Sequence, residues 1–172
     1  MLVSVGTDHH PFDRLVRWVD GWLGAQTDGA VTCLVQYGAS HPPTRARGLA
    51  YLDHGALGQV MGDAHVVVCH GGPSTIAEAR RNGHQPIVVP RNPRLGEHID
   101  DHQQRFSRRL AEAGLVRLAT SREDLVRALE DALTNAEQGH PAGNGVPSQP
   151  SATEAALRFG ALVEDLFAAR RR

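Results

Sequence analysis

The sequence HVVVCHGGPSTIAE, residues 65–78, joins a run of β-branched residues directly to a helix-forming segment. A continuous apolar run of this kind is typical of a strand that is buried on both faces, as in a parallel sheet. Gly71 and Gly72 remove side chains at a point where the backbone can come close to a ligand. The free N–H groups near Ser74 and Thr75, at the start of the helix, can then bind a phosphate. An ordinary glycine-rich turn with Ser74 as the helix N-cap remains the alternative.

On both sides of this stretch, apolar runs alternate with amphipathic segments. Strands are expected at 2–5, 31–36, 49–52, 65–69, 86–89 and 116–118, and helices at 12–23, 57–61, 76–80, 100–113 and 122–133. The alternation predicts right-handed crossovers and the α/β class, as a single Rossmann-like domain with a parallel sheet and helices on both faces. Ligands of such folds bind at the carboxyl ends of the strands, so the loops after Val5, Cys69 and Val89 are the informative ones.

The same pattern divides the chain into three parts. Residues 1–135 make up the Rossmann-like domain. Residues 136–152 are rich in glycine and proline, which predicts a flexible linker. Residues 153–172 carry an apolar stripe and are expected to form an amphipathic helix, which either packs on its own sheet or docks on a partner.

Composition excludes several classes of protein. The formal net charge of −1 gives no strong field for nucleic acid or an anionic membrane. Cys33 and Cys69 lie in apolar runs without metal-ligand spacing, so we expect buried thiols and no structural zinc. No apolar stretch is long enough to span a membrane, and residues 1–6 do not form a signal peptide. The expected location is therefore the cytoplasm, with membrane contact only through a partner.

A second group of polar residues follows the strand expected at 86–89. Arg91 is placed to meet a phosphate, and the segment GEHIDDHQ, residues 96–103, offers carboxylates and an amide for sugar hydroxyls. Two other interpretations stay open. One is a polar loop in which Asp100 or Asp101 caps the next helix. The other is a metal-dependent hydrolase using His98, Asp100, Asp101 and His102, although the cluster lacks a fixed metal-binding spacing.

A third group, VGTDHHP at residues 5–11, follows the first strand. Gly6 and Thr7 allow a close approach of the backbone to a ligand, and Pro11 suits the start of a helix. His9 or His10 is a candidate general base, with plain surface histidines as the alternative. Trp18 is expected at the edge of the core, or otherwise at a partner contact.

Taken together, HGGPSTIAEA (70–79), VPR (89–91) and GEHIDDHQ (96–103) resemble the C-terminal domain of family 28 glycosyltransferases. The similarity is closest to the small catalytic subunit of split bacterial polysaccharide glycosyltransferases, whose start fits VSVGTDHHPFDRLVRWVD at residues 3–20. The two-subunit eukaryotic enzyme that adds the second N-acetylglucosamine to a lipid-linked oligosaccharide, and the single-chain enzyme that makes lipid II, are more distant. The resemblance covers residues 1 to about 135.

The resemblance implies half of a GT-B fold, with UDP-sugar as the donor substrate. In the family, the loop matching residues 70–75 lies against the diphosphate, and the acid matching Glu78 contacts the ribose. The pair matching His102 and Gln103 contacts the sugar, where relatives carry Asn-Gln or Gln-Gln; Glu97 and Asp101 share that role. The donor-binding residues expected here are Gly6, Thr7, His70, Gly71, Gly72, Pro73, Ser74, Thr75, Glu78, Arg91, Glu97, His98, Asp101, His102 and Gln103.

The implied reaction inverts the anomeric centre and needs no metal and no cofactor beyond the donor. The catalytic base is not assigned, because in GT-B enzymes it often lies on the acceptor side. A whole GT-B enzyme needs roughly twice this length, which implies a membrane-associated partner subunit that binds the acceptor. The isolated chain can also form a homo-oligomer, and no nucleic-acid partner is expected. The alternative is a non-catalytic module that binds a nucleotide or nucleotide sugar, which would not need the sugar-side cluster 97–103.

Overall fold

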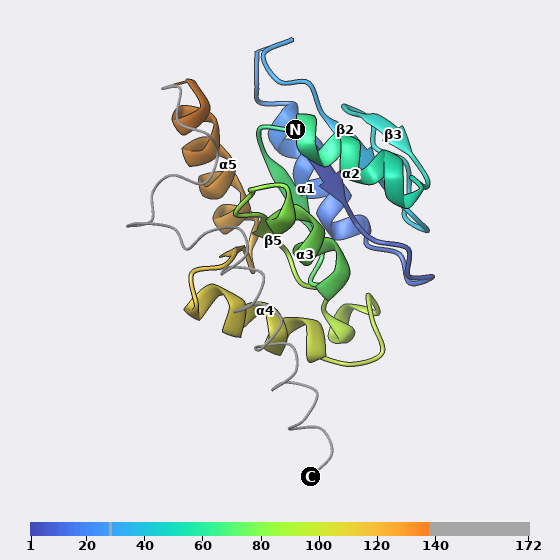
Figure 1. Cartoon of the computed structure of the whole chain (residues 1–172). Helices are drawn as coiled ribbons and strands as arrows, with labels where there is room; N and C mark the ends of the chain where they lie inside the picture. Colours follow the sequence, from blue (N-terminus) through green and yellow to red (C-terminus); the bar gives the residue numbers. More distant parts are fainter. Residues whose placement is uncertain (28, 138–172) are drawn as a thin grey trace.

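The computed structural model describes residues 1–27 and 29–137. Six strands form one sheet in the order β3-β2-β1-β4-β5-β6, and every neighbouring pair is parallel (Figure 1). The strands are β1 (Leu2–Ser4), β2 (Leu34–Gln36), β3 (Arg47–Leu49), β4 (Val67–Cys69), β5 (Ile87–Val88) and β6 (Arg117–Leu118). The helices are α1 (Asp13–Leu23), α2 (His54–Asp63), α3 (Pro73–Arg81), α4 (His102–Glu112) and α5 (Arg122–Glu137), with a 3-10 turn η1 (Pro93–Leu95) before α4. The expected Rossmann-like α/β fold is confirmed.

The strand order reverses between β1 and β4, and this reversal places the candidate site. From β1 the sheet first grows through β2 to β3, and the chain then returns to add β4 on the other side of β1. In register, Ser4 lies beside Cys69, so the loops that leave the two strands begin next to each other. Such a switch point opens a crevice at the carboxyl ends of the strands, where ligands of open α/β sheets bind.

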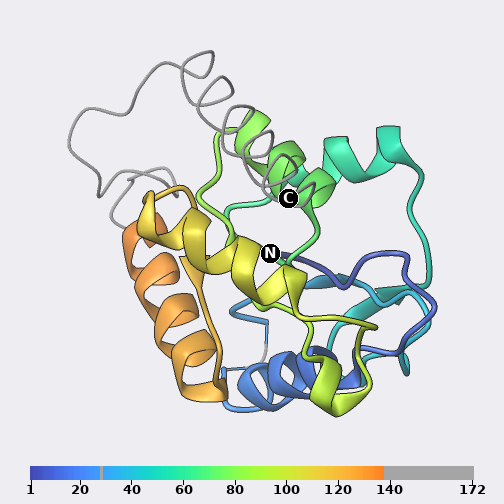
Figure 2. The ribbon, with the colours of Figure 1, turned by 90° about the horizontal axis from the view of Figure 1, so that it is seen from below.

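One face of the sheet is covered by α1 and α5, which contact each other (Figure 2). The apolar stripe expected between residues 12 and 23 supplies Leu15, Val19 and Trp22 to this core, and α5 supplies Leu125 and Leu129. All five side chains are almost completely buried. The amphipathic pattern of each helix therefore aligns its apolar stripe with the sheet.

The opposite face is covered by α2, α3 and α4, with α2 and α3 side by side in Figure 2. Met61 and Ala79 pack over the β1–β4 pair, and Ile76, Phe106 and Leu110 pack over β5. Because helices cover both faces, the central strand β4 is fully buried, as the β-branched run at 65–69 predicts.

Two local expectations are wrong at their boundaries. The strand expected at 49–52 is β3 at Arg47–Leu49, an edge strand whose first two residues are exposed, so apolar residues do not mark it. The helix expected from residue 100 starts at His102, because the Asp100 carboxylate accepts the His102 N–H and holds the chain in a turn. Asp101 occupies the N-cap position without a side-chain cap bond.

Two smaller predictions, for Trp18 and for the cysteines, are confirmed. Trp18 packs at the edge of the larger core, with the Arg14 guanidinium 4.6 Å from the centre of its ring. Cys33 and Cys69 are buried free thiols, and burial raises the pKa of each to about 12. No helix within residues 1–27 and 29–137 is long and apolar enough to cross a bilayer. The rest of the expected linker and the last helix, residues 138–172, lie outside the described residues.

Candidate donor-binding site

The loops after β1 and β4 meet through the side chain of His70. Gly6 has a φ of +84°, and a Cβ atom there would lie 2.5 Å from Cε1 of His70. A Cβ on Gly72 would lie 2.2 Å from Nε2 of the same ring. The amide of Gln36 donates to the Gly6 carbonyl at 3.0 Å and fixes the first loop. Both glycines are thus required by the close packing of the imidazole between the two loops.

His70 is held in its neutral form. Burial, and then the charge of the nearby Arg91, lower the pKa of His70 to about 4. Its Nδ1 atom is buried without a hydrogen-bond partner among the described residues. The unused nitrogen is therefore enclosed, and the neutral imidazole serves to pack the two loops together at the switch point.

We expect the fold to lose stability as the pH falls from about 6.5 to about 4. The folded-state pKa of His70 lies below its ordinary value of 6.5, so the unfolded chain binds the proton first. Above pH 6.5, neutral His70 makes its full contribution to the free energy of unfolding. That contribution is lost as the pH falls through the folded-state pKa, and the total loss is on the order of 3 kcal/mol.

Urea unfolding of the wild type and of His70→Gln, between pH 7 and pH 4, checks this expectation. The amide of the variant does not titrate, so its free energy of unfolding should fall less over this range than that of the wild type. Equal slopes for the two proteins would show that His70 is not the titrating group.

The start of α3 offers unpaired backbone donors at the same edge. Its N-cap is Gly72, with no side-chain cap bond, and Pro73 occupies the first turn. The alternative of a helix capped by Ser74 is therefore wrong. Ser74 is exposed and Thr75 is partly exposed, so their N–H groups, left over at the helix start, are open to an anion.

Glu78 points into a groove between α2 and α3. The groove has a volume of about 320 Å³ and is lined by Leu57, Ser74, Thr75 and Glu78, together with His54, Pro73, Ala77 and Arg81. This size is at the lower end of small-molecule sites, which run from roughly 300 to 1,000 Å³. Arg81, one turn further on, pairs with the Glu78 carboxylate. The carboxylate therefore shares this groove with Ser74 and Thr75 of the helix start.

Arg91 lies inside the protein rather than in the crevice. Its side chain is completely buried, and its terminal nitrogens donate to the carbonyls of Val5, His10 and Glu97 at 2.7, 2.6 and 2.9 Å. The guanidinium also lies 4.9 Å from the centre of the Phe12 ring. A phosphate contact would have to break these bonds, so we assign Arg91 the role of holding the two loops together.

Glu97 is likewise engaged within the protein. Both of its oxygens accept hydrogen bonds from Arg14 at 2.8 Å, and one also accepts the Asn92 N–H at 2.7 Å. The side chain is 4% exposed. Bidentate pairing of this kind fixes both groups, so Glu97 ties the segment before α4 to α1 instead of facing a sugar.

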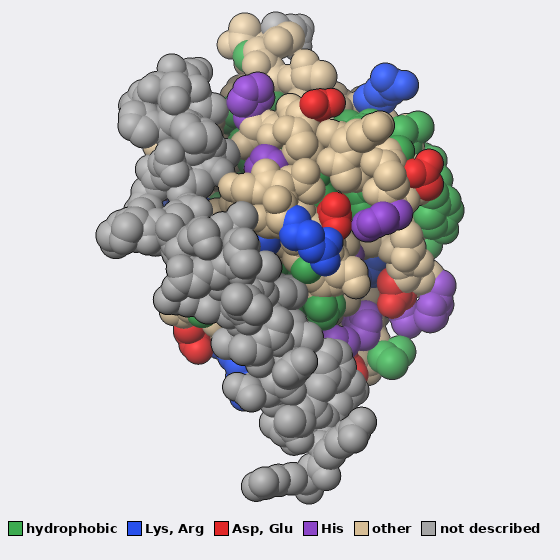
Figure 3. Space-filling model, in the orientation of Figure 1, with side chains coloured by type: hydrophobic (Ala, Val, Ile, Leu, Met, Phe, Trp, Pro, Cys, Tyr) green, Lys and Arg blue, Asp and Glu red, His purple; other side chains and the backbone are tan. Residues whose placement is uncertain are grey.

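Two Asp-x-His turns lie on either side of His98, in the loop after β1 and in the segment before α4. Asp8 Oδ1 accepts hydrogen bonds from the His10 backbone N–H (2.8 Å) and from the His10 ring at Nδ1 (2.6 Å). Asp100 Oδ1 accepts the corresponding hydrogen bonds from the His102 backbone N–H (3.1 Å) and from the His102 ring at Nδ1 (2.8 Å). His98 lies between them, with Nε2 3.6 Å from Asp8 Oδ2 and Nδ1 3.4 Å from Asp100 Oδ1. Figure 3 shows histidine and acidic side chains gathered at the lower right, over the β1–α1 loop and the segment before α4.

Both carboxylates of this cluster are ionised at neutral pH. Burial acts to raise the pKa of Asp8, but hydrogen bonds from His10 and the charge of Arg91 outweigh it and lower the pKa to about 2. For Asp100, a smaller burial effect is outweighed by hydrogen bonds from His102, and its pKa is also lowered. This cluster therefore carries two negative charges among the rings of His9, His10, His98 and His102.

The expected site residues thus divide into two groups. The exposed or partly exposed ones are Thr7, His70, Gly72, Pro73, Ser74, Thr75, Glu78, His98, Asp101 and His102, and the buried ones are Gly6, Gly71, Arg91, Glu97 and Gln103. Gln103 accepts the Arg91 N–H at 3.4 Å. The sequence did not predict that Arg14 and Gln36 support this site. Their hydrogen-bond partners lie 83 and 30 residues away, and no local pattern marks either residue.

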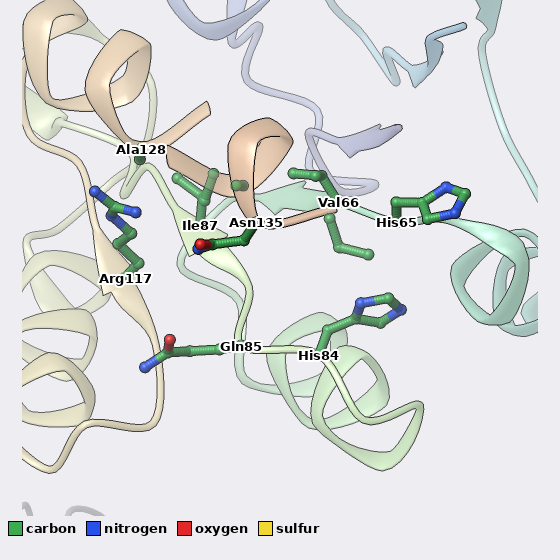
Figure 4. Close-up of a pocket in the computed structure, with 10 residues that line it drawn as sticks. His65, Val66, His84, Gln85, Ile87, Arg117, Ala128 and Asn135 are labelled. Atoms are coloured by element: carbon green, nitrogen blue, oxygen red, sulfur yellow. The ribbon is translucent and has the colours of Figure 1, made fainter. Parts of the chain in front are cut away.

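A further cavity lies at the opposite edge of the sheet. His65, Gln85 and Arg117 line it at the amino ends of β4, β5 and β6 (Figure 4). Its volume is about 60 Å³, which holds a few water molecules but no nucleotide. The crevice at the carboxyl ends remains the candidate site.

Comparisons with known proteins agree with this geometry. The glycosyltransferase family 28 C-terminal domain matches residues 1–155. Among solved structures, the chain is similar to MurG from Acinetobacter baumannii, with a TM-score of 0.52 and 18% sequence identity; the match covers 94% of this chain and 49% of that one. No curated protein matches. The chain belongs to glycosyltransferase family 28 and carries the C-terminal, nucleotide-sugar-binding type of domain of that family.

Proposed function

We propose that this chain binds the donor in an inverting, metal-independent glycosyl transfer from a UDP-sugar to a lipid-linked or polysaccharide acceptor. The observation that carries the proposal is the uncapped start of α3 at the switch point, next to the Glu78 groove. A diphosphate at this helix start would meet backbone N–H groups and the positive end of the helix dipole. The ribose would then reach Glu78, which can accept hydrogen bonds from two neighbouring hydroxyls.

The transfer step requires stabilisation of the negative charge that develops on the departing UDP. The N–H groups near Ser74 and Thr75 are fixed by the helix and need no rearrangement to provide it. Neutral His70 packs the loop before these groups in place without bringing a charge into the buried loop contact. On the sugar side, His102 is half-exposed at the start of α4 and is the accessible member of the His102–Gln103 pair.

We propose that the acceptor half lies on a separate chain. This chain spans about half the length of the MurG structure that it resembles. A GT-B enzyme closes its donor site with a second domain of similar size, so we propose a membrane-associated partner subunit that binds the acceptor and supplies the catalytic base. We further propose that the chain works in the cytoplasm and reaches the membrane surface through this partner.

Replacing Glu78 with alanine should weaken the binding of UDP by about 10- to 100-fold, because two hydrogen bonds from the ribose to a carboxylate are lost. Calorimetric titration of the purified chain with UDP, and with uridine, checks this. Uridine should lose affinity by a similar factor, since the contact is to the ribose rather than the phosphates.

Two controls make the titration specific. Arg81→Ala removes the ionic partner of Glu78 but keeps the carboxylate, so it should still bind UDP. Glu112→Ala removes an exposed acid at the end of α4 and should leave the affinity unchanged. A folded wild-type chain that does not bind millimolar UDP, or a Glu78→Ala variant that binds as well as the wild type, would refute this donor site.

A module that only binds nucleotides is the competing function. Co-expression with the partner subunit separates the two: a transferase should consume UDP-sugar in the complex and in neither chain alone. A sensor would bind the nucleotide but show no turnover in the complex.

A further inference from the structure

The segment His98-Ile99-Asp100-Asp101-His102 places two imidazoles and a carboxylate at alternate positions of one loop. One potential ligand atom from each of His98, Asp100 and His102 lies within 4.8 Å of the other two. We propose that these three residues form a binding site for a transition-metal dication of the Zn²⁺, Co²⁺ or Ni²⁺ class, with Asp8 as a neighbouring carboxylate. This site shares His102 with the proposed sugar contact, but its test does not depend on the proposed function.

The distances within the loop are close to those of a coordination site. In a tetrahedral site with bonds of 2.0 to 2.2 Å, neighbouring ligand atoms lie about 3.3 to 3.6 Å apart. Asp100 Oδ1 lies 2.8 Å from His102 Nδ1 and 3.4 Å from His98 Nδ1. Only a small movement of the two rings would turn these three atoms toward a common ion.

The hydrogen bonds that His98 Nδ1 and His102 Nδ1 now make can be replaced by bonds to a metal ion. The Asp100 N–H donates to His98 Nδ1 at 3.3 Å, which is longer than a good hydrogen bond. At His102 Nδ1, a metal ion would take the place of the N–H that the ring shares with Asp100, and the neutral ring would then carry its proton on Nε2. A metal ion binds the neutral form of imidazole, so protons compete with the ion and binding should weaken at acidic pH.

The loop is also held in place before any ion arrives. Arg91 bonds the Glu97 carbonyl, directly before His98, and the His10 carbonyl on the facing loop. Asp8 Oδ2 lies 3.6 Å from His98 Nε2, on the other side of that ring. A carboxylate beyond a ligating histidine fixes the ring and raises its basicity, as in known metal sites.

The ligand types point to the class of ion. Imidazole nitrogens favour Zn²⁺, Co²⁺ and Ni²⁺ over Mg²⁺ and Ca²⁺, which prefer sites made only of oxygens. Three protein ligands would leave one coordination position for water or another ligand. The ion would brace residues 98–102 at the sugar end of the crevice, and UDP binding at α3 should not need it.

The test is titration of untagged, chelator-treated protein with CoCl₂ and ZnCl₂, followed by visible absorption and calorimetry. We expect one equivalent of Co²⁺ to give the absorption of a nitrogen-ligated ion, and Zn²⁺ to displace it. His98→Gln and His102→Gln should each weaken binding by about 10- to 100-fold.

A matched control is available in His41. Its ring pairs with the Asp13 carboxylate at 2.9 Å, much as His102 pairs with Asp100, but outside the cluster. His41→Gln should bind Co²⁺ as the wild type does, and all variants should keep the wild-type circular dichroism. The proposal is overturned if the wild type shows no specific Co²⁺ absorption, or if His41→Gln weakens binding as much as His98→Gln and His102→Gln do.

Discussion

Arg91→Met should lower the free energy of unfolding by about 3–5 kcal/mol. The guanidinium is completely buried and donates to three backbone carbonyls, at Val5, His10 and Glu97. Methionine fills similar space but donates no hydrogen bond, so these carbonyls would lose their bonds inside the protein. Because small domains are stable by only about 5–15 kcal/mol, this is a large share of the total.

Urea unfolding at low temperature measures the effect even if the variant is unstable at 37 °C. Arg91→Lys keeps the charge but loses the planar, forked set of donors. Its free energy of unfolding should therefore lie between those of the wild type and Arg91→Met. Arg94→Met removes an exposed arginine three residues away and should change the stability by less than about 0.5 kcal/mol. If Arg91→Met loses no more stability than Arg94→Met does, the structural role of Arg91 is contradicted.

Gly72→Ala should reduce the affinity for UDP by about 100-fold. The backbone of Gly72 has a φ of −77° and a ψ of 127°, which alanine adopts without strain. The new methyl group would lie 2.2 Å from Nε2 of His70, so the imidazole or the start of α3 must move. Either movement displaces the donors that we assign to the diphosphate, and overpacking should also cost about 1–3 kcal/mol of stability.

A double variant tests whether the effect acts through His70. In Gly72→Ala combined with His70→Ala, the clash is removed, so stability and UDP affinity should return to those of His70→Ala alone. Gly62→Ala is the matched control, because its methyl group would lie 3.5 Å from the nearest atom, Asn82 Oδ1. If Gly72→Ala binds UDP like the wild type, the proposed path of the diphosphate is wrong.

Sequence patterns predicted the sheet, because the fold depends on local regularities. The β-branched run at 65–69, the apolar stripe at 12–23 and the glycines after β4 each act over a few residues, and parallel topology then brings the strand ends together. Side-chain direction does not follow from such patterns. Arg91 and Glu97 lie in a polar loop, where exposure is the default expectation, yet tertiary hydrogen bonds turn both inward.

The same limit applies to the site. The close packing of His70 against Gly6 joins residues 64 positions apart, and the pair of Arg14 and Glu97 is separated by 83. Neither contact leaves a periodic signal in the sequence. By contrast, Glu78 could be predicted to face the helix start, since residues one turn apart share a face of a helix.

The three carbonyls held by Arg91 have a consequence for engineering sugar specificity. A graft that exchanges residues 96–103 for the corresponding loop of another family member also replaces the backbone that Arg91 holds at Glu97. Such a chimera should keep its loop in place when the incoming segment preserves that carbonyl and the acid that pairs with Arg14. Under the proposed function, sugar specificity would then be exchanged by moving the whole loop together with these two anchors, rather than one contact residue at a time.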